Sequence, residues 1–367
     1  MLDVVVIGGG PAGAALAGRL AAAGCAVAVL EKSAFPRAKV CGEFIAAAGV
    51  RWLEELGIAP QAEVQRIALW AGGARLEAPL APGGALGRER LDTLLLENAA
   101  RAGAQVYQPA KARHVERTGR AAFTVFASQD IKLEARAVVA AHGSWELGGL
   151  PTQSRRRAAA ASDLFGVKAR FRRHGAPAGS VALAPFAGGY AGIVSLGDGS
   201  ATFAAAVRRD AWRDIRRRDA GASAGDALLR HAMRTSRALE EALGGAVREA
   251  PWRAVGPLRP GTRPVMREGI FAVGNAAGEV HPIVGEGIAL ALGSALALAG
   301  PLLETLERGG DPLHAAQIYR RRHRALFRRA WWRSACFAAL AMHPLASACA
   351  RGALERMPSL LALAARG

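Results

Sequence analysis

The sequence has few cysteines and no cluster of metal-ligating residues. Its four cysteines, Cys25, Cys41, Cys336 and Cys349, are widely separated along 367 residues. This spacing excludes a disulfide framework and a cysteine zinc site, and it is typical of a protein from a reducing compartment. Paired carboxylates and histidines at metal-ligand spacing are missing as well. We therefore expect no bound metal and a cytoplasmic protein.

The sequence also lacks a clear signal peptide or membrane-spanning segment. An apolar strand starts at residue 2, without the basic stretch that precedes the apolar core of a secretory signal. Two apolar segments, 287–303 and 334–350, come close to the roughly 20 residues that cross a bilayer. The first is rich in glycine and alanine, as in a helix packed under a cofactor, and the second contains His343 and Pro344. Neither segment predicts a membrane span.

Acidic residues are scarce relative to basic ones. The chain has 30 acidic and 48 basic residues, and its net charge is +18. A charge of this size raises the hypothesis of nucleic-acid binding. The basic residues are spread along the chain, however, without a helix-turn-helix, zinc-finger or aromatic RNA-binding motif. Only five of them are lysines, and arginine excess of this kind often reflects genome composition. We expect no nucleic-acid partner.

The first 23 residues form a strand-turn-helix pattern. Residues 4–7 are apolar and β-branched, which predicts a buried parallel strand, and residues 14–23 are mostly small, which predicts a closely packed helix. Between them, Gly8, Gly10 and Gly13 form G-x-G-x-x-G. In this motif the glycines permit a tight turn, a close approach of a pyrophosphate, and close packing of the helix on the strand. The N-terminus of the helix then faces the phosphates.

Two further features support dinucleotide binding. The next strand, CAVAVLEK, ends in Glu31, at about the ~20-residue offset where a carboxylate accepts hydrogen bonds from a ribose. Far along the chain, GIFAVGNAAGEVHPIVGEGIALALGSALALA again joins an apolar strand to a helix of small residues. Gly285 and Gly287 precede that helix, where a ligand could lie at its N-terminus. A second site of this kind is not typical of a nicotinamide dehydrogenase.

Four motifs together resemble FAD-dependent oxidoreductases of the superfamily of geranylgeranyl reductases and aromatic-ring hydroxylases of the p-hydroxybenzoate hydroxylase type. The first motif is the glycine fingerprint. FPRAKVCGE is similar to the P-R-x-K-x-C-G-G of geranylgeranyl reductases, and RERLD is similar to R-x-x-F-D. VGNAAG and HPIVGEGIALALGSALALA resemble G-D-A-A-G and P-x-x-G-E-G-I-x-x-A-x-x-S-G. The resemblance covers most of residues 1–325 and is closest to the geranylgeranyl reductase branch.

The resemblance implies FAD as the cofactor. It assigns the FAD contacts to Gly8, Gly10, Pro11, Ala12, Gly13, Glu31, Lys32, Arg37, Cys41, Gly42, Arg88, Gly274, Asn275, Pro282, Gly285, Gly287 and Ile288. Asp92 is expected to fix the start of the helix that carries Arg88. Asn275 stands where aspartate is usual, but its amide can still hydrogen-bond a ribityl hydroxyl. Glu43 replaces the last glycine of the second motif.

The candidate catalytic residues are Cys41, Glu43 and Glu286. Cys41 lies in the loop that runs beside the flavin in the similar proteins, although a cysteine in an apolar loop can also serve only in packing. Glu43 and Glu286 are candidate proton donors if they are buried beside the ring, because burial raises the pKa of a carboxyl group. Each could instead orient a loop or cap a helix. His142 and His281 are the remaining acid–base candidates. For each of them a structural role is expected rather than an acid–base role.

The reaction and the electron donor stay open at this point. Hydroxylases carry A-D-G-x-x-S where this chain reads AAHGSW, so His142 replaces an aspartate linked to FAD and NADPH contacts. The donor is therefore either NAD(P)H or a separate reductase protein. Halogenases of the group carry W-x-W-x-I-P and a reactive lysine, and both are missing from the matching stretches, which disfavours halogenation.

Two enzymatic reactions and one non-enzymatic role are then considered. The first reaction is reduction or dehydrogenation of a carbon–carbon bond, and the second is hydroxylation by an NAD(P)H-dependent flavin monooxygenase of an aromatic substrate. The non-enzymatic role is a flavin-bound scaffold at a membrane surface, without turnover. The apolar runs LFGVKARF and APFAGGYAG predict a hydrophobic substrate of polyketide, isoprenoid or aryl-lipid type, as in secondary metabolism.

We predict an α/β fold with a Rossmann-like FAD-binding domain of the glutathione-reductase type, an inserted mixed β-sheet substrate domain and a C-terminal helical region. The FAD-binding domain is discontinuous and comprises 1–62, 83–162 and 256–310. The substrate domain comprises 63–82 and 163–255, and a helical cap comprises 311–367. The cap combines arginine clusters with tryptophans. It is interpreted either as a lid with a solvated basic face or as an interfacial helix that contacts anionic lipid.

Overall fold

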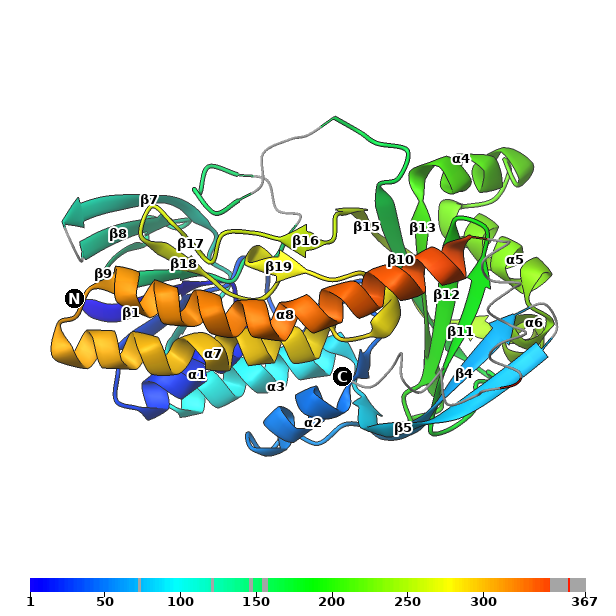
Figure 1. The fold of residues 1–367 in the computed structure, drawn as a ribbon, viewed down its shortest axis with the longest axis horizontal. Coiled ribbons are helices and arrows are strands. Elements are labelled where there is room, and N and C mark those ends of the chain that lie inside the picture. Colours follow the sequence, from blue (N-terminus) through cyan, green and yellow to red (C-terminus); the bar gives the residue numbers. More distant parts are fainter. Residues whose placement is uncertain (72–73, 120–121, 145–147, 154–157, 344–355, 357–367) are drawn as a thin grey trace.

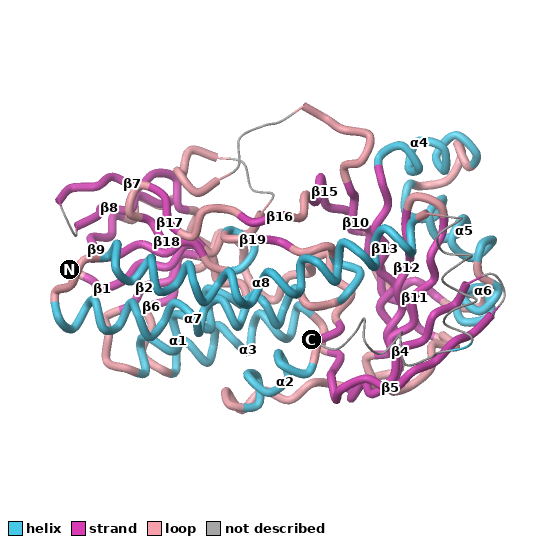
Figure 2. Tube along the Cα trace, in the orientation of Figure 1, coloured by secondary structure: helices cyan, strands magenta, loops and turns pink. Residues whose placement is uncertain are grey.

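The computed structural model describes residues 1–71, 74–119, 122–144, 148–153, 158–343 and 356. Two sheets lie side by side along the long axis of the molecule, and helices cover each of them (Figures 1 and 2). The predicted α/β fold is thereby confirmed.

The first sheet is built around five parallel strands. In spatial order these are β6 (Gln105–Tyr107), β2 (Val27–Leu30), β1 (Leu2–Ile7), β9 (Lys132–Ala140) and β18 (Ile270–Ala272). The short strand β17 (Met266–Arg267) lies antiparallel at the edge. Residues 4–7 of β1 and all of β2 are apolar because both faces of the sheet are covered there. The predicted buried strand at 4–7 is confirmed.

Helices cover one face of this sheet and a β-hairpin covers the other. The helices are α1 (Pro11–Ala22), α3 (Arg88–Arg101) and α7 (Gly287–Arg308), and the hairpin strands are β7 (Ala112–Gly119) and β8 (Ala122–Ala127). Small residues let these layers approach closely. A Cβ atom at Gly13 would lie 1.9 Å from the carbonyl oxygen of Gly8, and one at Gly18 would lie 3.3 Å from Cα of Ala99 in α3.

The second sheet has nine strands. In spatial order they are β14 (Val247–Arg248), β10 (Leu164–Arg172), β13 (Ser200–Arg208), β12 (Gly189–Ser195), β11 (Ser180–Phe186), β4 (Ala62–Ala71), β5 (Ala74–Ala85) and β3 (Phe44–Ile45), with β15 (Arg253–Leu258) beside β10. β4 and β5 pair antiparallel, and residues 63–71 and 74–82 of the predicted substrate domain lie within this pair. β15 carries this sheet past the boundary predicted at residue 255.

Three helices pack on the outer face of the second sheet. They are α4 (Arg209–Arg218), α5 (Ala224–Thr235) and α6 (Arg237–Leu243). All three lie within residues 163–255 of the predicted substrate domain. In α4, Ile215 is buried, and the partly buried Ala211 and Trp212 pack against the same core. The remaining elements are α2 (Ala47–Glu54), β16 (Gly261–Thr262), η1 (Gly274–Ala276), β19 (Gly278–Glu279) and η2 (Pro282–Val284).

The long helix α8 (Pro312–Met342) runs back along α7 and reaches the second sheet (Figure 1). The buried Tyr319 hydroxyl donates to the carbonyl of Ala272 in β18 at 2.9 Å, and the N–H of Gly188 donates to the carbonyl of Met342 at 3.0 Å. Both sheets are therefore tied to α8. Residues 344–355 and 357–367 of the predicted cap lie outside the described residues.

By length and hydropathy α7 could cross a bilayer, but 67% of its most apolar window is buried inside the protein. It packs between α1, α2 and α8. α7 is accordingly a core helix here, as its glycine-rich and alanine-rich sequence suggested, and a cytoplasmic location stays a prediction.

Candidate active site

A cavity of about 770 Å³ lies between the two sheets. The ends of β1, β2 and β18 reach it through Ile7, Leu30 and Val273, and the inner face of the second sheet forms its opposite wall. These are the carboxyl ends of parallel strands, where open α/β sheets bind their ligands. The cavity is large enough for an extended organic ligand.

Most of the residues selected from the sequence line this one cavity. They are Gly8, Gly10, Pro11, Ala12, Glu31, Lys32, Arg37, Cys41, Gly42, Arg88, Gly274, Asn275, Pro282, Gly285, Gly287 and Ile288. Gly13, Glu43 and Glu286 lie outside the lining. Two stretches more than 240 residues apart, at 8–12 and 274–288, therefore meet at the same site.

Two helices begin at the cavity wall with free backbone donors. α1 starts after Gly10 and α7 starts after Glu286, and neither has a side-chain cap. A Cβ atom at Gly10 or Gly287 would have no other atom within 4 Å, so the space in front of each glycine is open. Uncapped N–H groups and helix dipoles favour negative charge at such positions. The turn before α1 can thus hold a pyrophosphate, and the turn before α7 can hold an electron-rich ring edge.

Cations gather on the wall beside α1. Lys32, Arg37, Lys39 and Arg88 all line the cavity. Arg88 is held in place by Asp92, which accepts hydrogen bonds of 2.7 and 2.8 Å from its guanidinium group. Burial, together with the positive charges of Arg37, Arg88 and Lys32, lowers the pKa of Lys39 to about 8. A bound diphosphate would relieve this repulsion. Lys39 lies inside FPRAKVCGE but was not selected from the sequence.

Glu31 lies at the end of β2, as its spacing predicted. Its carboxylate is 3% exposed and accepts hydrogen bonds of 2.9 Å from the N–H groups of Gly9 and Ser33. Arg37 contacts the same carboxylate at 3.3 Å. These contacts fix the side chain at the cavity wall, and carboxylate oxygens have further lone pairs for ribose hydroxyl groups.

Cys41 and Tyr190 line the cavity from different sides, Cys41 from the loop after β2 of the first sheet and Tyr190 from the second sheet. Cys41 comes from the loop after β2, and its Sγ accepts a 3.4 Å hydrogen bond from the N–H of Glu43. Tyr190 comes from β12, and no hydrogen bond joins its hydroxyl to another described residue. Burial raises the pKa of Tyr190, with a smaller contribution from Cys41, so the phenol stays protonated. Tyr190 lies in the apolar run APFAGGYAG but was not selected from the sequence.

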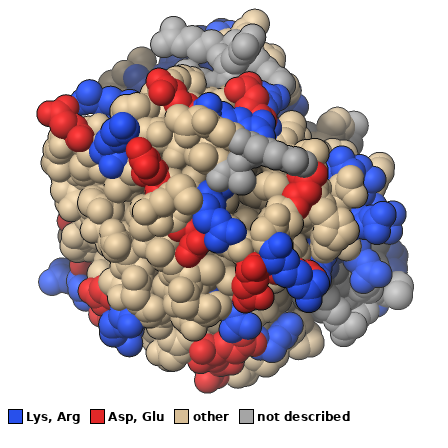
Figure 3. Space-filling model, turned by 90° about the vertical axis from the view of Figure 1, so that its left-hand side faces the viewer, with Lys and Arg blue, Asp and Glu red and all other residues tan. Residues whose placement is uncertain are grey.

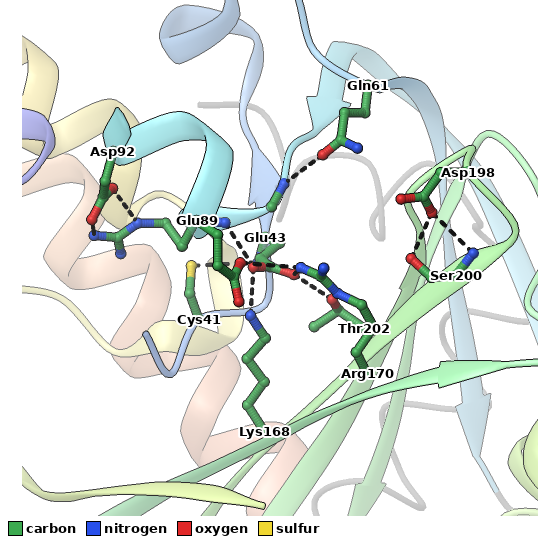
Figure 4. Close-up of polar contacts among 12 residues, drawn as sticks. Cys41, Glu43, Gln61, Glu89, Asp92, Lys168, Arg170, Asp198, Ser200 and Thr202 are labelled. Atoms are coloured by element: carbon green, nitrogen blue, oxygen red, sulfur yellow. Dashed lines mark hydrogen bonds and ion pairs between the residues drawn. The ribbon is translucent and has the colours of Figure 1, made fainter. Parts of the chain in front are cut away.

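Glu43 lies outside the cavity lining and is paired with cations, so the geometry gives no support to its expected role as a proton donor. Glu43 is fully buried, and its carboxylate contacts Lys168 Nζ and the Thr202 hydroxyl, with the N–H of Arg88 at 2.7 Å and Arg170 at 3.4 Å (Figure 4). Burial alone would raise its pKa, but the charge of Lys168 and these hydrogen bonds lower it overall. Glu43 is therefore a carboxylate that joins the loop after β2 to the second sheet.

Glu43 also occupies a backbone conformation that favours glycine. Its φ is 61°, in the left-handed region where side chains other than those of asparagine and aspartate are uncommon. This conformation fits the glycine of the similar motif. The chain thus keeps a glycine-like backbone while adding a carboxylate that the second sheet neutralises.

Glu286 faces the C-terminal helix rather than the cavity lining. Its Oε1 is paired with Arg333 of α8, and its Oε2 has no hydrogen-bond partner among the described residues. Burial raises the pKa of Glu286 despite the charge of Arg333. The geometry assigns Glu286 to the junction of α7 and α8 and gives no support to a proton donor beside the flavin.

The two histidines are held by local contacts. His281 is buried, accepts a hydrogen bond from the N–H of Ile283, and has its pKa lowered to about 4 by burial, so it is neutral. His142 lines the cavity, with Nδ1 2.8 Å from the carbonyl oxygen of Gly143 and Nε2 2.9 Å from the Thr152 hydroxyl. These contacts fit a neutral ring that donates from Nδ1 and accepts at Nε2.

A buried carboxyl group lies near Asn275. Glu279 lines the cavity, is 8% exposed, and accepts a 3.4 Å hydrogen bond from the Asn275 amide. Burial raises the pKa of Glu279, although Ser144 and Arg263 oppose this. Glu279 was not selected from the sequence, because a single glutamate in an apolar stretch carries no spacing signal.

The comparisons with known proteins agree with this site. A family model described as "FAD binding domain" matches residues 1–330. Digeranylgeranylglycerophospholipid reductase 2 of Methanopyrus kandleri is 32% identical over 312 residues, which cover 78% of this chain and 73% of that protein. The cofactor is FAD, and the protein is an FAD-dependent oxidoreductase.

Solved structures share the fold. A myxobacterial chondrochloren halogenase superposes with a TM-score of 0.76 at 24% identity, covering 91% of this chain and 83% of that one. A geranylgeranyl bacteriochlorophyll reductase-like protein of Thermoplasma acidophilum gives 0.72 at 23% identity, with coverage of 91% and 85%. At these identities the likeness establishes the fold and leaves the reaction to the site itself.

Proposed function

The chain belongs to the FAD binding domain family, and from this premise we propose that it reduces carbon–carbon double bonds of a hydrophobic, isoprenoid-type substrate. The observation that carries the proposal is the wall contributed by the second sheet. Ile67, Leu183, Ile193 and their neighbours on this wall are apolar, and Tyr190 supplies the only polar side chain among its described lining residues. Such a wall fits a long hydrocarbon chain, and the hydroxyl group of Tyr190 can donate a proton to it.

The side of the cavity formed by the first sheet and its helices would hold the cofactor. The turn after β1 and the cations beside it would bind the pyrophosphate, Glu31 the ribose, and the turn before α7 the flavin ring. When bound and reduced, FAD supplies a hydride equivalent. The fit rests on the open space at Gly10, Gly42 and Gly287, where a side chain would meet no protein atom within 4 Å.

Tyr190 would complete the reduction. Saturation of a double bond needs a proton on the second carbon, and Tyr190 carries a protonated hydroxyl in the same cavity as Cys41. The other described lining residues of the second-sheet wall are apolar, which makes this phenol the proton donor on that wall. The name of the Methanopyrus kandleri relative, a reductase of a geranylgeranyl lipid, supports the same class of substrate.

The test is an anaerobic reaction of the dithionite-reduced holoprotein with a polyprenyl alcohol such as geranylgeraniol. The proposal predicts that the flavin absorbance returns without oxygen and that Tyr190→Phe slows this return by about 100-fold or more, with FAD affinity unchanged. A flavin that reoxidises only when air is admitted, with or without a hydroxylated product, would contradict it. Titration with NADPH before dithionite shows whether NADPH or a partner protein supplies the electrons.

A further inference from the structure

The exposed face of α8 changes from basic to apolar along its length. At every fourth position from residue 320 to residue 340 the helix exposes, in order, Arg320, Arg324, Arg328, Trp332, Cys336 and Leu340. Residues four apart lie side by side on an α-helix, and a row of them turns by about 40° around the helix axis at each step. Arg324 and Leu340 thus lie about 80° to either side of Trp332. We call this row the α8 ridge. Over 20 residues it is about 30 Å long.

The basic half of the ridge is not neutralised. α8 contains no aspartate or glutamate from Pro312 to Met342, and Arg321 and Arg329 are exposed beside the ridge. No salt bridge joins the ridge arginines to another described residue. On the face drawn in Figure 3, by contrast, lysine and arginine are interspersed with aspartate and glutamate. The arginines of α8 therefore form a concentrated site for an anionic partner.

The apolar half of the ridge lies beside the opening of the cavity. Trp332 is 61% exposed and Leu340 is 43% exposed, although large apolar side chains are normally buried. Leu340 also lines the cavity, together with Phe337 and Ala341 of the same helix. An exposed residue that lines a cavity marks its rim. The ridge thus joins an arginine cluster, an exposed tryptophan and the cavity rim on one helix.

We propose that the α8 ridge docks the protein on an anionic lipid surface, with the arginines at the headgroups and Trp332 and Leu340 at the interface. Helices with arginine on one part and tryptophan or leucine on another lie in this interface. The cavity rim would then face the lipid, and a hydrophobic substrate could enter from the bilayer without crossing water. This inference goes beyond the reaction proposed above and does not depend on it.

The test is co-sedimentation of the full-length holoprotein with phosphatidylcholine vesicles, with or without phosphatidylglycerol. The matched pair is Arg320→Gln/Arg324→Gln/Arg328→Gln on α8 and Arg213→Gln/Arg217→Gln/Arg218→Gln on α4, which also exposes its arginines. At about fivefold per arginine, the α8 variant should lower the partition coefficient on anionic vesicles about 100-fold. The α4 variant should change it little, and added salt should weaken binding.

A second measurement locates the contact. A polarity-sensitive fluorophore on Cys336 should shift to shorter wavelength on anionic vesicles, with Cys336→Ser protein as the labelling control. Recovery of the holoprotein in the supernatant, equal binding to uncharged vesicles, or equal loss in the α4 and α8 variants would each overturn the proposal. The flavin spectrum of every variant should stay that of the parent protein, because the ridge arginines lie outside the cofactor site. Failure of docking is therefore distinct from failure of the proposed reaction.

Discussion

Removing Lys168 alone should destabilise the protein strongly, because it leaves the Glu43 carboxylate buried without its main counter-charge. Glu43 is 0% exposed and Lys168 is 4% exposed. Loss of one partner of such a pair costs about 3–5 kcal/mol. Lys168→Met and Glu43→Gln should each lower the free energy of unfolding by this amount. Both should be measured by urea denaturation of the holoprotein at a fixed excess of FAD.

The double variant Glu43→Gly/Lys168→Met separates charge from packing. It removes both charges and restores glycine at a position with φ of 61°, where a side chain other than glycine costs about 1–3 kcal/mol. In the matched cycle, Glu43→Gln/Lys168→Met should cost about 3 kcal/mol less than the sum of the two single costs. Additive costs, or single costs below about 1 kcal/mol, would refute the account of Glu43 as a buried anchor.

The same pair sets a pH dependence. The pKa of Glu43 lies below its ordinary value of 4.5, mainly because Lys168 and hydrogen bonds overcome the effect of burial. A carboxyl group whose pKa is lowered on folding stabilises the protein above its unfolded pKa. That contribution is lost as the pH falls through the folded pKa. The parent protein should therefore lose stability below about pH 4.5 more steeply than Glu43→Gly/Lys168→Met.

Further predictions concern the cofactor. Lys39 has a pKa of about 8, so the affinity for FAD should fall from pH 7 to pH 9 as the charge of Lys39 is lost. Flavin fluorescence measures this affinity. Lys39→Met should bind FAD about tenfold more weakly at pH 7, and its affinity should not change between pH 7 and pH 9. A pH profile shared by both proteins would contradict that role. Gly10→Val should abolish FAD binding but leave the apoprotein folded, because its Cβ enters open space, whereas Gly13→Val should fail to fold, because its Cβ would lie 1.9 Å from the Gly8 carbonyl oxygen. Circular dichroism separates the two outcomes, and normal FAD binding by Gly10→Val would contradict the placement of the pyrophosphate.

Local sequence patterns predicted the elements that hold the cofactor. The strand, turn and helix at residues 2–22 are dictated by an apolar run, three glycines and small residues over a short stretch. Their order along the chain is enough to place Glu31 at the end of the next parallel strand. The second turn, before α7, follows the same pattern of an apolar strand, glycines and a helix of small residues. These features need no knowledge of distant contacts.

The contacts between the two sheets could not be predicted in this way. Glu43 and Lys168 are 125 residues apart, and a lysine in an apolar strand gives no sign of its partner. For the same reason the direction of the Glu43 pKa could not be predicted from its neighbours in the sequence: burial raises it, but the counter-charge that lowers it comes from the second sheet. Tyr190 likewise lines the same cavity as Cys41 only because the fold places β12 opposite the loop after β2.

The most direct test of the central claim is the mass of the product formed from a polyprenyl substrate. The reduced holoprotein would be incubated with geranylgeraniol in two parallel samples, one under anaerobic conditions and one in air. The mass of the extracted alcohol would then be measured by mass spectrometry. The account predicts a gain of two hydrogens per reduced double bond in both samples. A product that gains one oxygen in air, with no change under anaerobic conditions, would show a monooxygenase and contradict the account.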